Sequence, residues 1–150
     1  MLSQTQEWVC RRIVAESQDA VIFADRAGVI RLWNAGAAAM FGYPAGEALG
    51  QPLDLIIPEN LRARHGEGYR RVMASGETKY GKDLLAVPGL KKDGSRLSLE
   101  FTIALIRDEA GDILGAAAII RDVTARFARD RELQKRLAAL EARVKPGIDR

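Results

Sequence analysis

His65 is the single histidine of the chain, and a neutral imidazole can bind a metal, transfer a proton or titrate close to neutral pH. Leu61, His65, Tyr69 and Val72 are separated by four, four and three positions. This spacing places the four side chains on one face of a helix within residues 56–76. The candidate chemistry of the chain therefore depends on what that helical face packs against.

The signals for the start of this helix are Pro58, whose φ is fixed, and Asn60, whose side chain can cap the first turn. The helix is therefore predicted to begin near Leu61. Gly66 and Gly68 lie inside it, where each costs about 0.8–1 kcal/mol relative to alanine. Either the helix is locally strained, or a flat or bulky group needs the room that the glycines leave.

Two interpretations of His65 are open. The imidazole is a half-buried helix residue that hydrogen-bonds a neighbour, or it is an axial ligand of haem, for which one histidine suffices. Enzyme chemistry has little support, because the chain contains no P-loop, no Gly-x-Ser-x-Gly and no Cys-x-x-Cys sequence. One histidine alone does not make a metal cluster, so we expect no catalytic site.

The composition is that of one globular domain with extensions: 150 residues, of which 47% are hydrophobic and 29% charged. The net charge of +3 is small and its basic residues are mixed with acidic ones, so we expect no nucleic-acid partner. Cys10 is the one cysteine, which excludes an internal disulfide and suits the cytoplasm. No apolar run approaches about 18 residues and the N-terminus lacks a signal-peptide core, so we expect a soluble chain with no membrane partner.

Apolar periodicity and turn residues predict the elements that precede the histidine helix. Asn34 is a natural cap for a helix that Gly42 then ends. The predicted elements are an amphipathic helix at Gln4–Glu16, hairpin strands at 20–24 and 29–33, a helix at Ala35–Phe41, a further helical turn at 43–50 and an apolar segment at 53–57.

Three further strands are predicted after the histidine helix, at about 79–87, 96–106 and 113–120. Turn residues separate them at 91–94 and 108–112. In the middle strand apolar and polar residues alternate, which gives it one buried and one polar face. The sequence thus predicts an α+β fold, with a five-stranded antiparallel sheet, short helices on one face, and amphipathic helices at both ends of the chain.

A long helix is predicted to follow the last strand. Asp122 and Thr124 stand at its start, where we expect their side chains to cap the junction and couple the sheet to the helix. Pro146 and Gly147 end it. The helix carries a seam of about two heptads with spacings of four, three and four: Leu133, Leu137, Leu140 and Val144. The seam packs on the domain itself, or, as we predict, the N- and C-terminal helices form a homodimer.

The order of these elements resembles that of the PAS family. The local sequences that carry the resemblance are Asn34 with MFGY at 40–43, EALG at 47–50, Ile57-Pro58, KDG at 92–94 and RDVT at 121–124. The resemblance covers about 17–124 and implies a PAS domain there, an N-terminal helical extension at 1–16, and a C-terminal signalling and dimerisation helix with a tail at 125–150. PAS domains bind haem, flavins, small organic ligands or nothing, so the fold alone does not give the function.

Residues 57–65 resemble the corresponding stretch of haem-binding PAS oxygen sensors, both rhizobial histidine-kinase sensors and bacterial oxygen-sensing phosphodiesterases. This resemblance implies that His65 is the proximal ligand of haem b and that Arg71 meets a haem propionate. Tyr69, on the same helical face as His65, is the third expected cofactor-binding residue of this segment.

The sheet departs from those sensors at the distal side of the implied haem. Their distal arginine, which stabilises bound oxygen, corresponds to a position at or near Leu85, and leucine donates no hydrogen bond. Phe101 and Ile103 match an apolar distal wall on the next strand. This departure disfavours oxygen sensing and leaves carbon monoxide, nitric oxide or redox state as the candidate signals.

Two alternatives to haem are kept. The first is a flavin. No cysteine follows Cys10, which disfavours the covalent flavin chemistry of light-sensing PAS domains. FAD or FMN could still bind non-covalently near Trp33, although Trp33 is more simply a core residue. The other alternative is a cofactor-free module for dimerisation or partner docking. In each case the chain signals through a partner protein, or it is part of a longer signalling protein.

Overall fold

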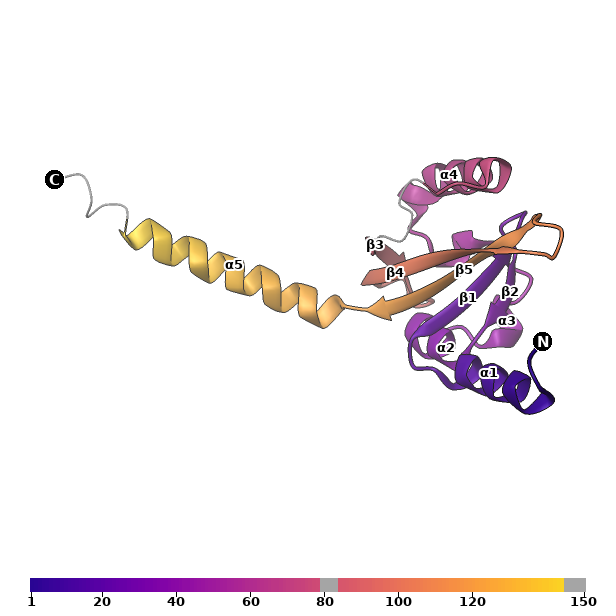
Figure 1. Cartoon of the computed structure of the whole chain (residues 1–150). Helices are drawn as coiled ribbons and strands as arrows, with labels where there is room; N and C mark the ends of the chain where they lie inside the picture. The colour runs from indigo at the N-terminus through magenta and orange to yellow at the C-terminus, as the bar shows by residue number, and fades with distance from the viewer. Residues whose placement is uncertain (79–83, 145–150) are drawn as a thin grey trace.

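Local signals set most of the element boundaries. The computed structural model describes residues 1–78 and 84–144. The elements are α1 (Gln4–Glu16), β1 (Ala20–Asp25), β2 (Ile30–Trp33), α2 (Ala35–Phe41), α3 (Ala45–Ala48), the 3-10 turns η1 (Leu53–Ile56) and η2 (Glu59–Leu61), α4 (Arg62–Ser75), β3 (Leu85–Leu90), β4 (Arg96–Arg107), β5 (Ile113–Asp122) and α5 (Thr124–Val144). The strands form one antiparallel sheet of five in the order β2-β1-β5-β4-β3, which confirms the predicted α+β fold (Figure 1).

Alternate residues of the strands form one inner face of the sheet, as the period of two requires. Ile22, Leu99 and Ile120 lie on this face and are at most 5% exposed. Phe41 of α2 and Ile56 of η1 pack into the same buried cluster. The short helices therefore cover the inner face, and the core forms where they meet it.

Asn34 does more than cap α2. Its Oδ1 accepts hydrogen bonds from the backbone N–H groups of Ala37 and Val21, each at 2.9 Å. Its Nδ2 donates to three carbonyl oxygens around the end of α1, those of Val14, Ser17 and Asp19. α1 is thus docked on its own domain by polar bonds, although none of its residues is buried.

α4 begins at Arg62, as predicted to within one residue, but its predicted cap is wrong. Asn60 is not its cap: the N-cap residue is Leu61, which makes no side-chain cap bond. The 3-10 turn η2 runs directly into the helix, so the chain already turns before the position where a cap is needed. The Asn60 Oδ1 accepts instead from the Arg96 guanidinium at 3.1 Å.

The third strand also ends later than predicted. β3 continues through Pro88 to Leu90, beyond the expected end at Val87. Proline is tolerated there because β3 is an edge strand of the sheet. Residues 79–83 of the predicted strand, and the predicted helix stop at Pro146, lie outside the described residues.

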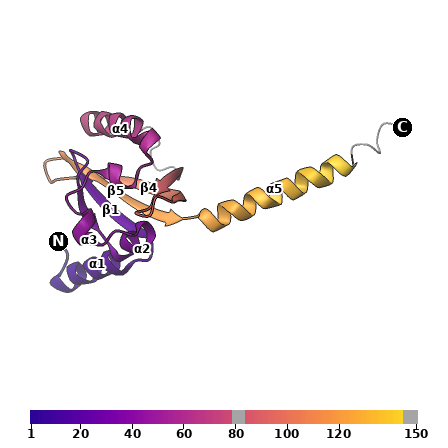
Figure 2. The same ribbon diagram turned by 180° about the vertical axis from the view of Figure 1, so that it is seen from behind.

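α5 leaves the sheet at the end of β5 and projects away from the rest of the domain (Figures 1 and 2). The predicted capping of this junction is confirmed. The Asp122 carboxylate accepts from the Thr124 backbone N–H and hydroxyl, and the Thr124 Oγ1 accepts from the Ser98 N–H of β4 at 3.0 Å. An ion pair between Arg126 and Glu100 holds the first turn to the same strand.

In the described part of the chain, the helices are all too short or too polar to cross a membrane. α5 is the longest, at 21 residues, and charged residues occur along its whole length.

Candidate functional site

α4 is attached to the sheet mainly through polar groups. The Tyr69 hydroxyl donates to the carbonyl oxygens of Ala24 at 3.0 Å and Asp25 at 2.6 Å, at the end of β1. Met73, one turn later, is 4% exposed and is the one buried residue of α4. Tyr69 and Met73 therefore mark the side of the helix that faces the sheet.

Arg26 fastens the C-terminal end of the same helix. Its guanidinium donates to the carbonyl oxygen of Met73 at 3.4 Å and to that of Ile113, at the start of β5, at 3.1 Å. Arg107 adds a bond to the carbonyl oxygen of Gly76 at 3.0 Å. Arg26 of the β1–β2 turn and Arg107, the last residue of β4, thus hold the end of α4. The residues next to them in the sequence do not indicate this role.

His65 lies on the sheet-facing side of α4, one turn before Tyr69. The two rings are 6.2 Å apart at 28°. Burial lowers the pKa of His65 below its ordinary value of 6.5, and the negative charge of Asp54 in η1 offsets part of that shift. The imidazole is therefore neutral at pH 7 and keeps a free lone pair on one ring nitrogen.

The imidazole makes no hydrogen bond to any residue in 1–78 or 84–144. The hydrogen-bonding neighbour that the first interpretation of His65 requires is therefore not found among these residues. The neighbour that the imidazole does contact is the stacked ring of Tyr69. Burial also raises the pKa of Tyr69 from 10 to about 12, so its hydroxyl remains a donor to the β1 carbonyls at neutral pH.

The three predicted sheet residues share the inner face. Leu85 of β3 pairs with Phe101 of β4, and Ile103 is the next inward residue of β4. All three are half-buried, whereas Leu97 and Leu99 earlier in the strand are 8% and 4% exposed. In the described residues, no ring contact or hydrogen bond joins this group to His65.

Arg71 is not on the side of α4 that carries His65. It follows His65 by six positions, which turns it roughly 120° around the helix. Its guanidinium is 3.4 Å from the Glu67 carboxylate, with the two side chains 72% and 69% exposed. The structure thus brings His65 and Tyr69 together and Leu85, Phe101 and Ile103 together, and leaves Arg71 outside both groups.

The helix glycines leave open space. A Cβ built on Gly68 would meet no atom within 4 Å, and one on Gly66 would meet only the Arg70 guanidinium at 3.5 Å. A side chain at position 66 or 68 would therefore not clash with the rest of the protein. This contrasts with Gly36 of α2, where a Cβ would lie 2.3 Å from the Asp19 carbonyl oxygen.

The donor set suits haem better than a bare metal ion. Among the described residues, no three His, Cys, Asp or Glu side chains are grouped to hold a metal. A porphyrin brings four nitrogens of its own, so a single neutral imidazole is sufficient to attach its iron. His65 meets that requirement, and the apolar inner-face residues suit the ring.

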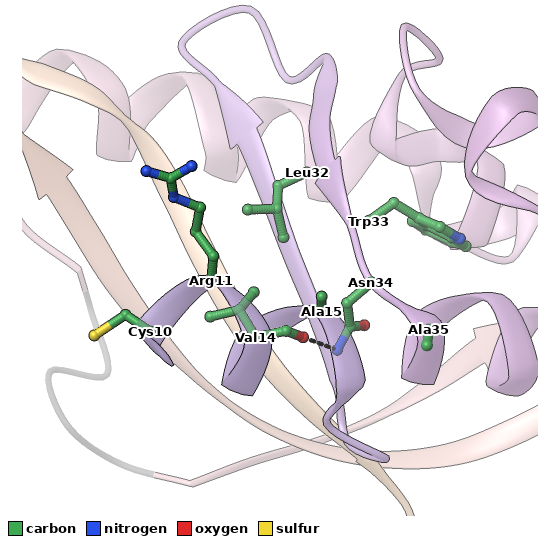
Figure 3. Close-up of a pocket in the computed structure, with 8 residues that line it drawn as sticks. All are labelled: Cys10, Arg11, Val14, Ala15, Leu32, Trp33, Asn34 and Ala35. Carbon is green, nitrogen blue, oxygen red and sulfur yellow. Dashed lines mark hydrogen bonds between the residues drawn. The ribbon is translucent and has the colours of Figure 1, made fainter. Parts of the chain in front are cut away.

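A separate hollow of about 580 Å³ lies between α1 and the β2–α2 connection (Figure 3). No pattern in the sequence indicates this hollow, because it depends on how α1 docks on the domain. It is mostly apolar and is lined by Cys10, Arg11, Val14, Ala15, Leu32, Trp33, Asn34 and Ala35. Trp33 itself is a core residue, 6% exposed, whose indole N–H donates to the Tyr43 carbonyl oxygen at 2.9 Å.

A family model described as the PAS fold matches residues 14–128. The sensor protein FixL of Bradyrhizobium diazoefficiens is 28% identical over 141 residues, which are 94% of this chain and 27% of that protein. The oxygen sensor protein DosP of Escherichia coli is 25% identical over 119 residues, which are 79% of this chain and 15% of that protein. The chain thus spans a minor part of the length of these relatives.

Among solved structures, an RNA-binding light-oxygen-voltage receptor matches with a TM-score of 0.71 and 22% identity. The match covers 95% of this chain and 40% of that chain. At this level of identity the likeness concerns the fold.

Proposed function

The chain belongs to the PAS family, and from that premise we propose that it is a sensory domain that binds haem b through His65 and passes the state of the haem to α5. The observation that carries the proposal is the His65 imidazole: half-buried, neutral, and without a hydrogen-bond partner in the described residues. A neutral imidazole that spends no lone pair on the protein is available to iron.

The other residues of the site have separate roles in this proposal. Tyr69 fixes α4 to β1 through its hydroxyl and packs its ring beside the imidazole. The open space at Gly68 leaves room against the helix. Leu85, Phe101 and Ile103 supply an apolar inner-face surface for the porphyrin.

Haem supplies an iron centre that binds a diatomic gas or changes oxidation state. Leu85 offers no hydrogen bond to a bound gas, which favours carbon monoxide, nitric oxide or redox state over oxygen as the signal. Arg71 can bind a propionate only if its exposed ion pair with Glu67 breaks. Such a pair stabilises a helix by about 0.3–0.5 kcal/mol. FixL and DosP are named as a sensor and an oxygen sensor, which supports a sensory role.

The route to α5 runs through β4. Leu99 and Phe101 lie on the inner face, and Ser98 of the same strand bonds to Thr124 and, through its carbonyl oxygen, to the Val123 N–H. A shift of β4 caused by a group on its inner face would therefore move the first turn of α5. A signalling protein, or a further segment of the same protein, would receive this movement.

Addition of haem to the purified protein tests the proposal. We expect a strong Soret band with the parent, its loss or a large weakening with His65→Ala, and a small loss of affinity with Arg71→Ala. The matched control is Trp33→Phe, which changes an aromatic residue outside the proposed site. Imidazole added to His65→Gly should restore the Soret band, which separates a lost ligand from a lost fold.

An unchanged spectrum and affinity in His65→Ala would overturn the ligand assignment. The second candidate is a cofactor-free interaction module, which is favoured by exposed apolar residues on α1 and α5, among them Trp8, Ile13 and Leu137. Absence of both a Soret band and bound yellow FAD or FMN would favour that module.

A further inference from the structure

α1 touches its own domain without filling the space beside it. The Asn34 amide nitrogen holds the end of the helix through the carbonyl oxygens of Val14, Ser17 and Asp19, and no α1 residue is buried. Next to this attachment lies the hollow of about 580 Å³ that Figure 3 shows. Its volume falls in the range of about 300–1,000 Å³ in which small-molecule sites are found.

One face of α1 forms a wall of this hollow. Cys10, Arg11, Val14 and Ala15 line it, and their spacings of three and four positions place them on one side of the helix. Leu32 of β2 belongs to the facing wall (Figure 3). None of the residues that line the hollow belongs to the candidate haem site.

Most polar side-chain groups around the hollow are already engaged. The Asn34 side chain accepts two hydrogen bonds and donates three, and the Trp33 indole N–H is bonded to a carbonyl oxygen. Among the lining residues, the one charged group is the Arg11 guanidinium, whose side chain is 77% exposed. Its Nη2 lies 3.8 Å from the Glu7 carboxylate, which is longer than a hydrogen bond, and such an exposed pair contributes little.

We propose that the hollow binds a monocarboxylic acid with an apolar body, such as a medium-chain fatty acid. The apolar walls, among them Val14 and Leu32, take the body of the ligand out of water. The planar guanidinium of Arg11 donates two parallel hydrogen bonds to the carboxylate. A cationic ligand would be repelled by Arg11, and a neutral one would leave its charge unused.

Binding should also hold α1 more firmly on the domain. The ligand would contact α1 and, through Leu32 and Ala35, the β2–α2 connection at the same time, so it stabilises the docked helix by mass action. Hydrogen exchange in α1 should therefore slow when the ligand is present. The proposal does not depend on haem, so His65→Ala should leave it unaffected.

The one cysteine of the chain reports whether the hollow is occupied, because Cys10 is exposed and lines it. Octanoate is the probe, and with about ten non-hydrogen atoms it should bind at roughly millimolar concentration. At saturation it should slow the reaction of Cys10 with N-ethylmaleimide about threefold or more. In the control protein Cys10→Ser/Lys135→Cys, whose thiol lies on α5, octanoate should not change the labelling rate.

Ligands of equal length test the charge. Octan-1-ol should bind about three- to tenfold more weakly than octanoate, and octylamine more weakly still, because neither pairs with a guanidinium. Arg11→Gln should remove this preference for octanoate. Arg12→Gln is the matched control and should keep it, since Arg12 pairs with Glu16 and does not line the hollow.

A larger side chain in the hollow tests the location. Ala15→Phe, at an exposed position of α1, should weaken octanoate and octan-1-ol alike. Unchanged labelling of Cys10 up to about 20 mM octanoate would overturn the proposal, as would equal octanoate affinity of the parent and Arg11→Gln. Tighter binding of octyl phosphate would overturn the choice of a carboxylate. Labelling that slows with protein concentration alone would show that a second copy occupies the hollow, which also contradicts the proposal.

Discussion

α2 and α4 contact the same sheet in different ways. α2 has seven residues and buries Gly36, Ala37 and Phe41, whereas α4 has fourteen and buries only Met73. α2 is held by packing around Phe41 and by the buried Asn34 cap. α4 is held by Tyr69 and by the guanidinium groups of Arg26 and Arg107. The short helix is part of the core, and the long one is attached to it at a few points.

This difference bears on function because packing and polar attachment respond differently to change. A close-packed helix cannot move without opening a cavity, whereas a helix held by a few hydrogen bonds can shift over a bound group at small cost. A site for a cofactor is therefore expected along α4 and not along α2. The following experiments compare the two helices, in order of decreasing expected effect.

Phe41→Ala should lower the free energy of unfolding by about 3–5 kcal/mol, because a fully buried ring leaves a cavity. Phe101→Ala, the same change at a half-buried position in the middle of β4, should cost about 1–2 kcal/mol. Urea unfolding of the haem-free protein measures both. Equal losses in the two variants would show that the inner face is packed as tightly around Phe101 as around Phe41.

Asn34→Ala should cost about 2–3 kcal/mol, since it leaves buried backbone groups at α2 and at the end of α1 without partners. Asn34→Asp is the matched control, because it keeps the acceptor for Ala37 and loses the donations to α1. Hydrogen exchange should then increase in α1 but not in α2. Equal protection of both helices in the aspartate variant would contradict the docking role of the amide nitrogen.

Tyr69→Phe should cost about 0.5–1.5 kcal/mol, the contribution of one hydroxyl bond to the sheet. Folding raises the pKa of Tyr69 from 10 to about 12. The contribution of the protonated hydroxyl to the free energy of unfolding is therefore fully present below pH 10 and is lost as the pH rises toward 12. Unfolding measured between pH 9 and 11 should show this loss in the parent and a smaller one in the variant. Identical slopes would show that the hydroxyl ionises as freely in the folded chain as in the unfolded one.

His65→Gln should have the smallest effect on stability. Folding lowers the pKa of His65 below its ordinary value of 6.5. The contribution of the neutral imidazole to the free energy of unfolding is therefore fully present above pH 6.5 and is lost as the pH falls below that value. Between about pH 7 and 5, the free energy of unfolding should therefore fall more steeply in the parent than in the variant, which lacks the imidazole. The same protonation competes with iron, so haem affinity should fall over that range. A pH-independent affinity would count against iron binding by this imidazole.

Local signals were sufficient where an element depends on its own residues. The sequence determined α1 and α2 to their end residues, because a capping side chain begins α2 and Gly42, with φ of 82°, ends it. The alternation along β4 likewise determined which side chains face inward. The junction at Asp122 and Thr124 was predictable for the same reason, since one side chain caps the next turn.

Tertiary structure decided what depends on residues far apart in the chain. The amide of Asn34 reaches α1, and Arg26 reaches a carbonyl 87 positions away, contacts that no local pattern encodes. Asn60 bonds to Arg96 because a 3-10 turn already precedes α4. Spacing alone put His65 and Tyr69 on one helical face, but only the packing of α4 against β1 decided that this face is half-buried, which lowers the pKa of the imidazole, while Arg71 remains in solvent.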